Sequence, residues 1–182
     1  MATAHAVLTK IVSRSGLDDQ ENKALIHILR RAIPNRVVAT ANQTVAGTTL
    51  TASTGLAIDQ GFYLNGGAPL QANSKYHVKG TLYCLGVTSN GIKLDLGGGT
   101  ATVTTGTQIN YKILTASTVA DSNVTSLTTT ASATTIVTEV EIDGYLVCNG
   151  SGTLVLRFAE QANSTGVVVY AGSWLEVSEA LN

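Results

Sequence analysis

The chain has 182 residues and a formal net charge of −1, and only 13% of its residues are charged. This length fits one domain with a small appendage, and no apolar run approaches the roughly 20 residues that a membrane-spanning helix needs. Thr, Ala, Gly and Ser take the place of charged residues. Such a weakly charged surface suits a protein that works within a large assembly.

Charge is unevenly distributed along the chain. Residues 1–36 carry six basic and three acidic groups, a net +3, and the remainder carries five basic and nine acidic groups, a net −4. The asymmetry predicts either that the N-terminal segment docks on an acidic surface or that it forms solvated helix faces. Its basic residues are not interleaved with aromatic ones, so we predict no nucleic-acid partner.

The N-terminal segment is the only one with a helical pattern. Asp18 and Glu21 have capping-box spacing, and Pro34 closes the element, which predicts a helix over 19–33. Its apolar side carries Leu25, Ile28, Leu29 and Ala32 at helical spacing. A second, shorter helix is expected over 4–13. These elements define an N-terminal arm, residues 1–36.

The arm cannot bury its apolar side within two short helices. That side therefore covers an end of the following domain, packs against other copies of the arm, or lies on another protein. Arg30 and Arg31 occupy the last turn and favour the helix dipole. The residues that we expect to dock on a partner combine the apolar stripe with these charges, namely Leu25, Ile28, Leu29, Arg30 and Arg31.

Residues 37–54 are predicted to be a linker or edge strands, and residues 55–182 a β-domain. Turn signals recur there about every 8–12 residues, which is typical of an all-β sandwich or barrel. The predicted strands are Leu56–Ile58, Phe62–Leu64, Lys75–Leu85, Ile92–Leu96, Thr100–Thr105, Gln108–Leu114, Val124–Leu127, Thr134–Glu139, Val140–Cys148, Thr153–Ala159, Gly166–Tyr170 and Trp174–Val177.

Alternation is clearest in two of these segments, over 75–85 and 140–148, where apolar and polar residues take opposite faces. Two connections have the composition of hairpin turns. Asn90-Gly91 precedes the strand at 92–96, and Asn149-Gly150-Ser151-Gly152 lies between the strands at 140–148 and 153–159. We therefore predict that each pair of flanking strands is a hairpin.

The two cysteines, Cys84 and Cys148, lie on apolar faces of predicted strands. The first fifteen residues lack the uninterrupted apolar core of a secretory signal. We therefore expect two buried free thiols in place of a disulfide.

Chemistry-bearing motifs are scarce. The three histidines have no metal-ligand spacing, and Gly97-Gly98-Gly99-Thr100 lacks the lysine and the helix of a phosphate loop. Glu139, Glu141 and Asp143 share one strand face, which is either solvated or a weak cation site. We predict no catalytic residue, cofactor or metal, and no enzymatic activity.

Three aromatic residues are candidates for a subunit interface: Tyr83, Tyr145 and Trp174. Aromatic residues are enriched at such interfaces. Trp174 begins the last predicted strand, and its alternative role is to cover one end of the core.

Five segments, in order, resemble bacteriophage virion structural proteins with a tumour-necrosis-factor-like jelly-roll domain. They cover residues from about 50 onward and are Tyr76–Tyr83, Gly91–Leu96, Leu114–Val124, Gly152–Ala159 with Gln161 and Asn163, and Ala171–Val177. The resemblance implies an antiparallel jelly-roll sandwich, here with a short N-terminal α-helical arm. It also implies a virion protein, assembled in the host cytoplasm and commonly a homotrimer, and it transfers no catalytic residues.

These features together lead us to expect a capsid decoration (cement) protein whose arm binds the major capsid protein. The alternative is a head-fibre, tail-fibre or receptor-binding protein that recognises a cell-surface glycan. Its candidate aromatic residues, Tyr63, Tyr83, Tyr145 and Tyr170, are scattered along the chain. A third possibility is a non-viral binding module.

Overall fold

A computed structural model describes residues 20–21, 25, 34–59, 69–86, 91–162 and 166–180. Most of the expected arm lies outside these residues. Gln20, Glu21 and Leu25 are described, and each is helical. The remainder of the predicted helix over 19–33, the helix over 4–13 and the strand Phe62–Leu64 lie outside the described residues and stay predictions.

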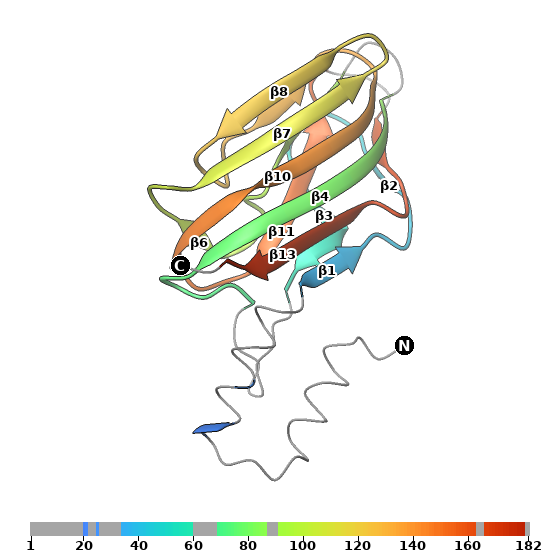
Figure 1. The fold of residues 1–182 in the computed structure, drawn as a ribbon. Helices are drawn as coiled ribbons and strands as arrows, with labels where there is room; N and C mark the ends of the chain where they lie inside the picture. The colour runs from blue at the N-terminus through green and yellow to red at the C-terminus, as the bar shows by residue number, and fades with distance from the viewer. Residues whose placement is uncertain are drawn as a thin grey trace.

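The described chain is mainly β and forms two antiparallel sheets, shown in Figure 1. The large sheet has the order β1-β13-β4-β10-β7-β8, where β2 and β12 continue the β1–β13 edge and β6 pairs with the end of β10. Its strands are β1 (Asn35–Val38), β2 (Gln43–Val45), β4 (Lys75–Gly86), β6 (Thr102–Val103), β7 (Gln108–Thr115), β8 (Val119–Val124), β10 (Val137–Gly150), β12 (Val167–Val169) and β13 (Trp174–Glu179).

The small sheet lies behind the large one in Figure 1 and has the order β3-β11-β5-β9. Its strands are β3 (Thr51–Ile58), β5 (Ile92–Asp95), β9 (Ala131–Ala133) and β11 (Leu154–Glu160). Because each sheet has one apolar face, the two faces pack on each other and exclude water.

The core fills the space between the sheets and follows the alternation of the sequence. Leu82 on β4, Leu146 on β10 and Phe158 on β11 are fully buried. Their neighbours Tyr83, Tyr145 and Arg157 point outward. Burial of each such side chain contributes about 1.5–3 kcal/mol. The predicted faces of the strands over 75–85 and 140–148 are thus confirmed.

The chain crosses between the two sheets at most of its connections. β10 belongs to the large sheet and β11 to the small one, and β4 and β5 are divided in the same way. Both hairpin predictions are therefore wrong. Each of these strands pairs with strands that are distant in sequence, because its apolar face must oppose the preceding strand across the core.

Three predicted strands are at least half loop in the structure. The segment Val124–Leu127 is mostly loop, since β8 ends at Val124. The segment 134–139 is split, because β10 begins only at Val137, and Thr100–Thr105 contracts to the two residues of β6. Leu127 is buried although it lies in a loop, where its carbonyl accepts a hydrogen bond from Leu96 N. A buried loop leucine among threonines has the same sequence pattern as a short strand.

Residues 35–58 are part of the sandwich. β1 and β2 lie at one edge of the large sheet, and residue 55 falls inside β3. Gln43 on β2 bonds with its side chain to the backbone of β3, through Nε2 to Ala52 O (3.1 Å) and through Oε1 to Thr54 N (2.9 Å). This contact closes one side of the sandwich.

Candidate functional site

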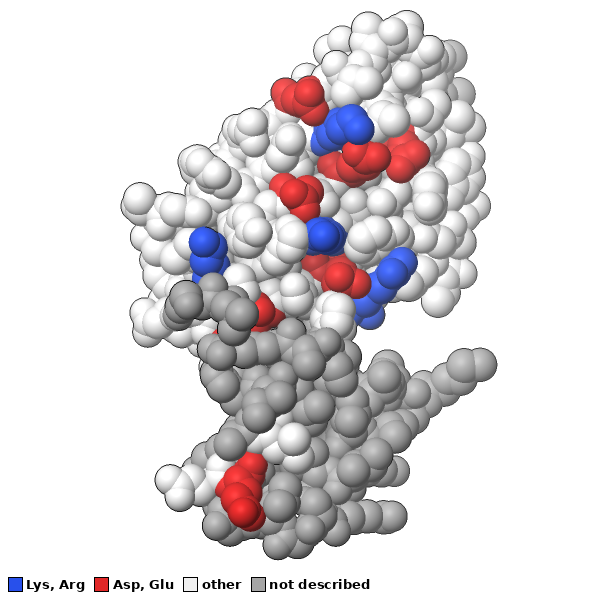
Figure 2. Space-filling model, viewed as in Figure 1, with Lys and Arg blue, Asp and Glu red and all other residues white. Residues whose placement is uncertain are grey.

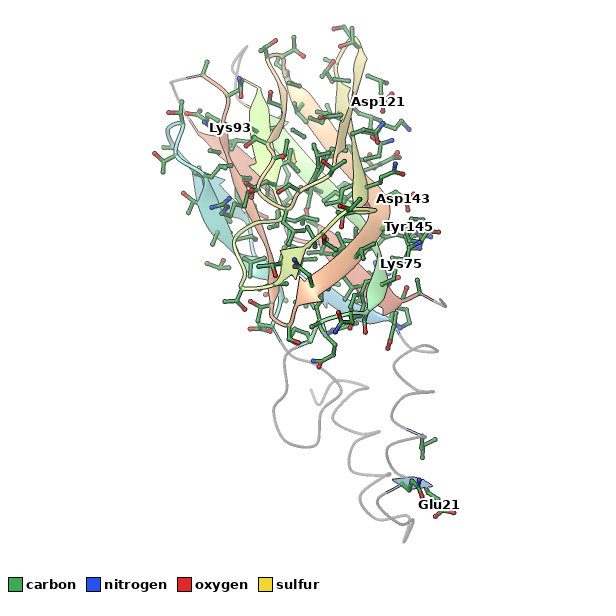
Figure 3. All side chains as sticks on the ribbon, turned by 90° about the vertical axis from the view of Figure 1, so that its left-hand side faces the viewer. Glu21, Lys75, Lys93, Asp121, Asp143 and Tyr145 are labelled. Carbon is green, nitrogen blue, oxygen red and sulfur yellow. The ribbon has the colours of Figure 1, made fainter. Side chains whose placement is uncertain are left out.

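The outward side of the large sheet, called the outer face below, carries most of the described charged side chains. Figure 2 shows acidic and basic groups alternating across it. The strand register explains the pattern, because Arg36, Glu176, Lys79 and Asp143 follow one another across β1, β13, β4 and β10. Opposite charges on directly paired residues stabilise a sheet. Figure 3 shows Asp143, Tyr145 and Lys75 on this side and Lys93, of the small sheet, on the opposite one.

Trp174 lies on the outer face, because Leu175 and Val177 take the buried positions of β13. The guanidinium carbon of Arg36 lies 4.2 Å from the centroid of the Trp174 ring. A cation over an indole contributes about 0.5–1 kcal/mol at an exposed site. Trp174 therefore does not cover the core, and β1 supplies the cation that stacks on it.

Tyr145 stands at the centre of a second group on the outer face. Its ring stacks on His77 with 4.8 Å between centroids, and Lys75 Nζ lies 4.8 Å from its centroid. His77 Nε2 is 2.8 Å from Asp143 Oδ1. Sequence reasoning placed these residues on outward faces but missed their contacts, since only the β4–β10 register brings them together.

Tyr83 is 44% exposed, the same fraction as Tyr145. It follows Thr81 on β4, the residue that pairs with Trp174. Tyr83 and Trp174 are thus diagonal neighbours, whereas Tyr145 lies farther along β10 opposite His77. The structure therefore places all three candidates on one face but in two separate groups.

The carboxylates at Glu139, Glu141 and Asp143 share the outer face, as predicted. Lys112 Nζ bonds to Glu141 Oε2 at 2.9 Å, and this hydrogen bond, with the charge of Glu141, raises the pKa of Lys112. Within the described part of the chain, no group of three His, Cys, Asp or Glu residues could hold a metal ion.

Two acidic residues that sequence reasoning did not single out as buried are sealed inside the fold. Asp95 is fully buried and accepts two bonds from Arg157, from Nε (2.9 Å) and from the terminal nitrogen (2.6 Å). Glu160 is also buried and accepts bonds from Gly47 N, at 2.9 Å, and from Gly166 N. Both join separate segments, so their roles are structural.

The Gly97–Thr100 segment is a turn packed on Thr153, whose Oγ1 accepts a bond from Thr100 N at 3.1 Å. A Cβ at Gly99 would lie 2.1 Å from Thr153 O, so the chain needs glycine there. The segment leads into strand β6. A phosphate-binding loop needs a helix at this point, so the segment does not have the structure of such a loop.

Cys84 and Cys148 are buried free thiols, as predicted. They lie near opposite ends of the paired strands β4 and β10, roughly 30 Å apart at the usual rise per residue. Burial raises the pKa of Cys84 to about 12, with a further contribution from the charge of Glu139, and burial raises that of Cys148 to about 11.

These thiols predict a loss of stability at alkaline pH. Because each pKa is higher in the folded than in the unfolded chain, the unfolded chain loses its thiol protons first, from about pH 9. The free energy of unfolding should fall from about pH 9 toward pH 12. Urea unfolding between pH 8 and 11 measures this, and the double variant Cys84→Ala, Cys148→Ala should show a shallower fall. An equal slope in both proteins would contradict the assignment.

Of the predicted docking residues, only Leu25 is described, and it is helical and half-buried. Ile28, Leu29, Arg30 and Arg31 lie outside the described residues. In the part of the chain that the structure describes, no helix has the length and apolarity needed to cross a membrane.

Comparison with known proteins adds no assignment: no family model matches the chain, and no curated protein matches it.

Proposed function

We propose that this chain is a phage capsid decoration protein: a jelly-roll domain that trimerises and attaches to the shell through its N-terminal arm. The mechanism is mechanical. Trimers seated where capsomers meet add buried contact area between neighbouring shell subunits. Because a bound partner stabilises the state to which it binds, internal pressure must then break these contacts too.

The strand order is the observation that carries the proposal. A jelly roll places its first, eighth, third and sixth strands in one sheet and its second, seventh, fourth and fifth in the other. If β1 with β2 counts as the first strand and β12 with β13 as the eighth, the large sheet runs β1-β13-β4-β10 and the small sheet β3-β11-β5-β9 in this order. The segments β6, β7 and β8 are then an insertion between the fourth and fifth strands.

The outer face supports the trimer. It carries Tyr83, Tyr145 and Trp174 together with the exposed apolar residues Val38 and Leu85. Most of its ionised groups lie opposite a group of the other sign in a cross-strand pair, which lowers the cost of covering them. The small sheet offers mostly short side chains on its outward side, such as Ala52, Ala57 and Ser132.

The glycan-binding alternative has less support. Sugars stack on open aromatic faces beside polar groups. Here Arg36 lies over Trp174, and His77 and Lys75 lie against Tyr145.

A surface variant tests the trimer interface. Replacing Tyr83 by arginine puts a charge into the apolar part of the outer face, and we expect sedimentation equilibrium to shift from trimer toward monomer. Ser132→Arg, on the exposed surface of β9, is the matched control and should leave the mass unchanged. A trimer that persists in the Tyr83 variant would rule out the outer face as the trimer interface.

Binding to purified, undecorated shells tests the arm. The full-length double variant Arg30→Glu, Arg31→Glu should bind roughly tenfold more weakly, because it replaces attraction by like-charge repulsion. Lys93→Glu, on the small sheet, controls for net charge. A chain that lacks residues 1–33 should lose binding altogether, and undiminished binding by this chain would refute the role of the arm.

A further inference from the structure

The described sandwich has four sheet edges, and three of them are protected against further strand pairing. The β1–β2 edge is made of two short strands interrupted between Val38 and Gln43. The β3 edge is capped by the Gln43 side chain and carries a register shift against β11. The third edge, β9, has only three residues. Natural sheets guard their edges with such devices.

The fourth edge, β8, has none of these protective features. It is the outermost strand of the large sheet, at the top of Figure 1. Its six residues, Val119–Val124, pair with β7 without a register shift and contain no proline. Within the described part of the chain β8 pairs with β7 alone. It is therefore the longest regular edge open to another strand.

The register identifies the backbone groups that face outward from this edge. Thr115 N donates to Thr118 O at 2.9 Å, so this pair is hydrogen-bonded at the turn between β7 and β8. Hydrogen-bonded and non-bonded pairs alternate along an antiparallel ladder. Ala120, Ser122 and Val124 therefore bond to β7. The N–H and C=O groups of Val119, Asp121 and Asn123 point away from the sheet.

The charge beside this edge is negative. Asp121 pairs across the ladder with Lys112, but Lys112 already bonds to Glu141. The charges of Asp121 and Glu139 also act on this one ammonium group. Val119, next to Asp121 on the same side of β8, is 55% exposed and offers apolar contact. A strand that pairs here meets an apolar side chain and a carboxylate.

These features argue against a second copy of β8 as the occupant. In antiparallel self-pairing, residues on the same face oppose each other, so Asp121 would face Val119, Asp121 or Asn123 of the other copy, and none of these is a cation. Like charges that are directly opposed destabilise a sheet, and an amide leaves the carboxylate uncompensated. The edge thus favours a strand of opposite charge.

We propose that β8 is a docking edge for an extended strand of another protein, which adds to the large sheet and places a lysine or arginine opposite Asp121. The main-chain groups of Val119, Asp121 and Asn123 supply the hydrogen bonds, and Asp121 selects the sequence. Strand addition of this kind takes affinity from the backbone and specificity from alternate side chains. The inference does not depend on the decoration role.

The test uses the full chain and two capped peptides, Thr-Val-Thr-Lys-Thr-Val-Thr and the same sequence with glutamate in place of lysine. Amide hydrogen exchange is followed by NMR at about 1 mM peptide, the range expected for one short strand. In the free protein, the amides of Val119, Asp121 and Asn123 should exchange faster than those of Ala120 and Ser122. The lysine peptide should slow these three amides at least severalfold, and the glutamate peptide should not.

Charge exchange completes the test. Asp121→Lys should reverse the preference between the two peptides, whereas Asp143→Lys, an equal charge change on the central strand β10, should leave it unchanged. The proposal is overturned if neither peptide protects the three amides, or if Asp121→Lys leaves the preference as it was. Protection that grows with protein concentration alone would also overturn it, because the occupant would then be a second copy.

Discussion

Replacing Arg157 by methionine is expected to lower the free energy of unfolding by about 3 kcal/mol. Arg157 donates two hydrogen bonds to the fully buried Asp95, whose Oδ1 also accepts a bond from Gly97 N at 3.0 Å. Methionine keeps the length of the apolar stem but removes the guanidinium. The Asp95 carboxylate then stays buried without its cation, and that desolvated charge is the physical origin of the loss.

Urea unfolding at pH 7 measures the effect, and Lys112→Met is the matched control. Lys112 and Glu141 form the same kind of ion pair, but both side chains are nearly half exposed, at 44% and 45%. Solvent screens such a pair, so its loss should lower the free energy of unfolding much less than the loss of the Asp95–Arg157 pair does. Equal losses in the two variants would contradict the view that burial sets the strength of the Asp95–Arg157 pair. The double variant Asp95→Leu, Arg157→Met should recover part of the stability, because it removes the stranded charge.

The second large effect is expected at Gly144, in the middle of β10. Gly144 pairs with Val78 on one side and Ile109 on the other, and it is buried. A Cβ at this position would lie 2.3 Å from Gln108 O and 2.7 Å from Ile109 Cα. These are backbone atoms, so β7 must move as a whole to admit a methyl group. We expect Gly144→Ala to lower the free energy of unfolding by about 3 kcal/mol, at the upper end for overpacked sites.

Gly172→Ala is the comparison for this variant. Gly172 has a φ of +90°, but no atom lies within 4 Å of the place that a Cβ would take, so alanine there meets backbone strain without a clash. Such strain costs about 1 kcal/mol. Thermal unfolding of the two variants should therefore rank Gly144→Ala as the less stable. The reverse order would show that the β7–β10 pairing is more adaptable than its geometry indicates.

The alternation of buried and exposed residues was predictable where a strand has one buried and one exposed face. In β4, the alternation predicts Tyr76 and Val78 inward and His77 and Lys79 outward, and the structure agrees. The same holds for β10 and β13. For Tyr83 and Tyr145, the alternation in the sequence predicts the outward position directly. For Trp174 it leaves two alternatives, of which the outward position is one.

The candidate site was less predictable, because its contacts join residues far apart in sequence. Arg36 reaches Trp174 only because β1 pairs with β13, and His77 reaches Tyr145 only through the β4–β10 register. The Asp95–Arg157 pair depends on β5 and β11 lying side by side. No spacing within one segment could signal any of these contacts.

The sequence by itself determined that the described chain is β-rich and which side of its longer strands is buried. Both follow from the alternation of apolar and polar residues, which is a property of a single strand. Only the tertiary structure decided which strands pair. Asn149-Gly150 and Asn90-Gly91 have hairpin composition, yet their flanking strands lie in different sheets. The physical reason is that a turn fixes only the local direction of the chain, whereas pairing is decided by burying two apolar sheet faces against each other.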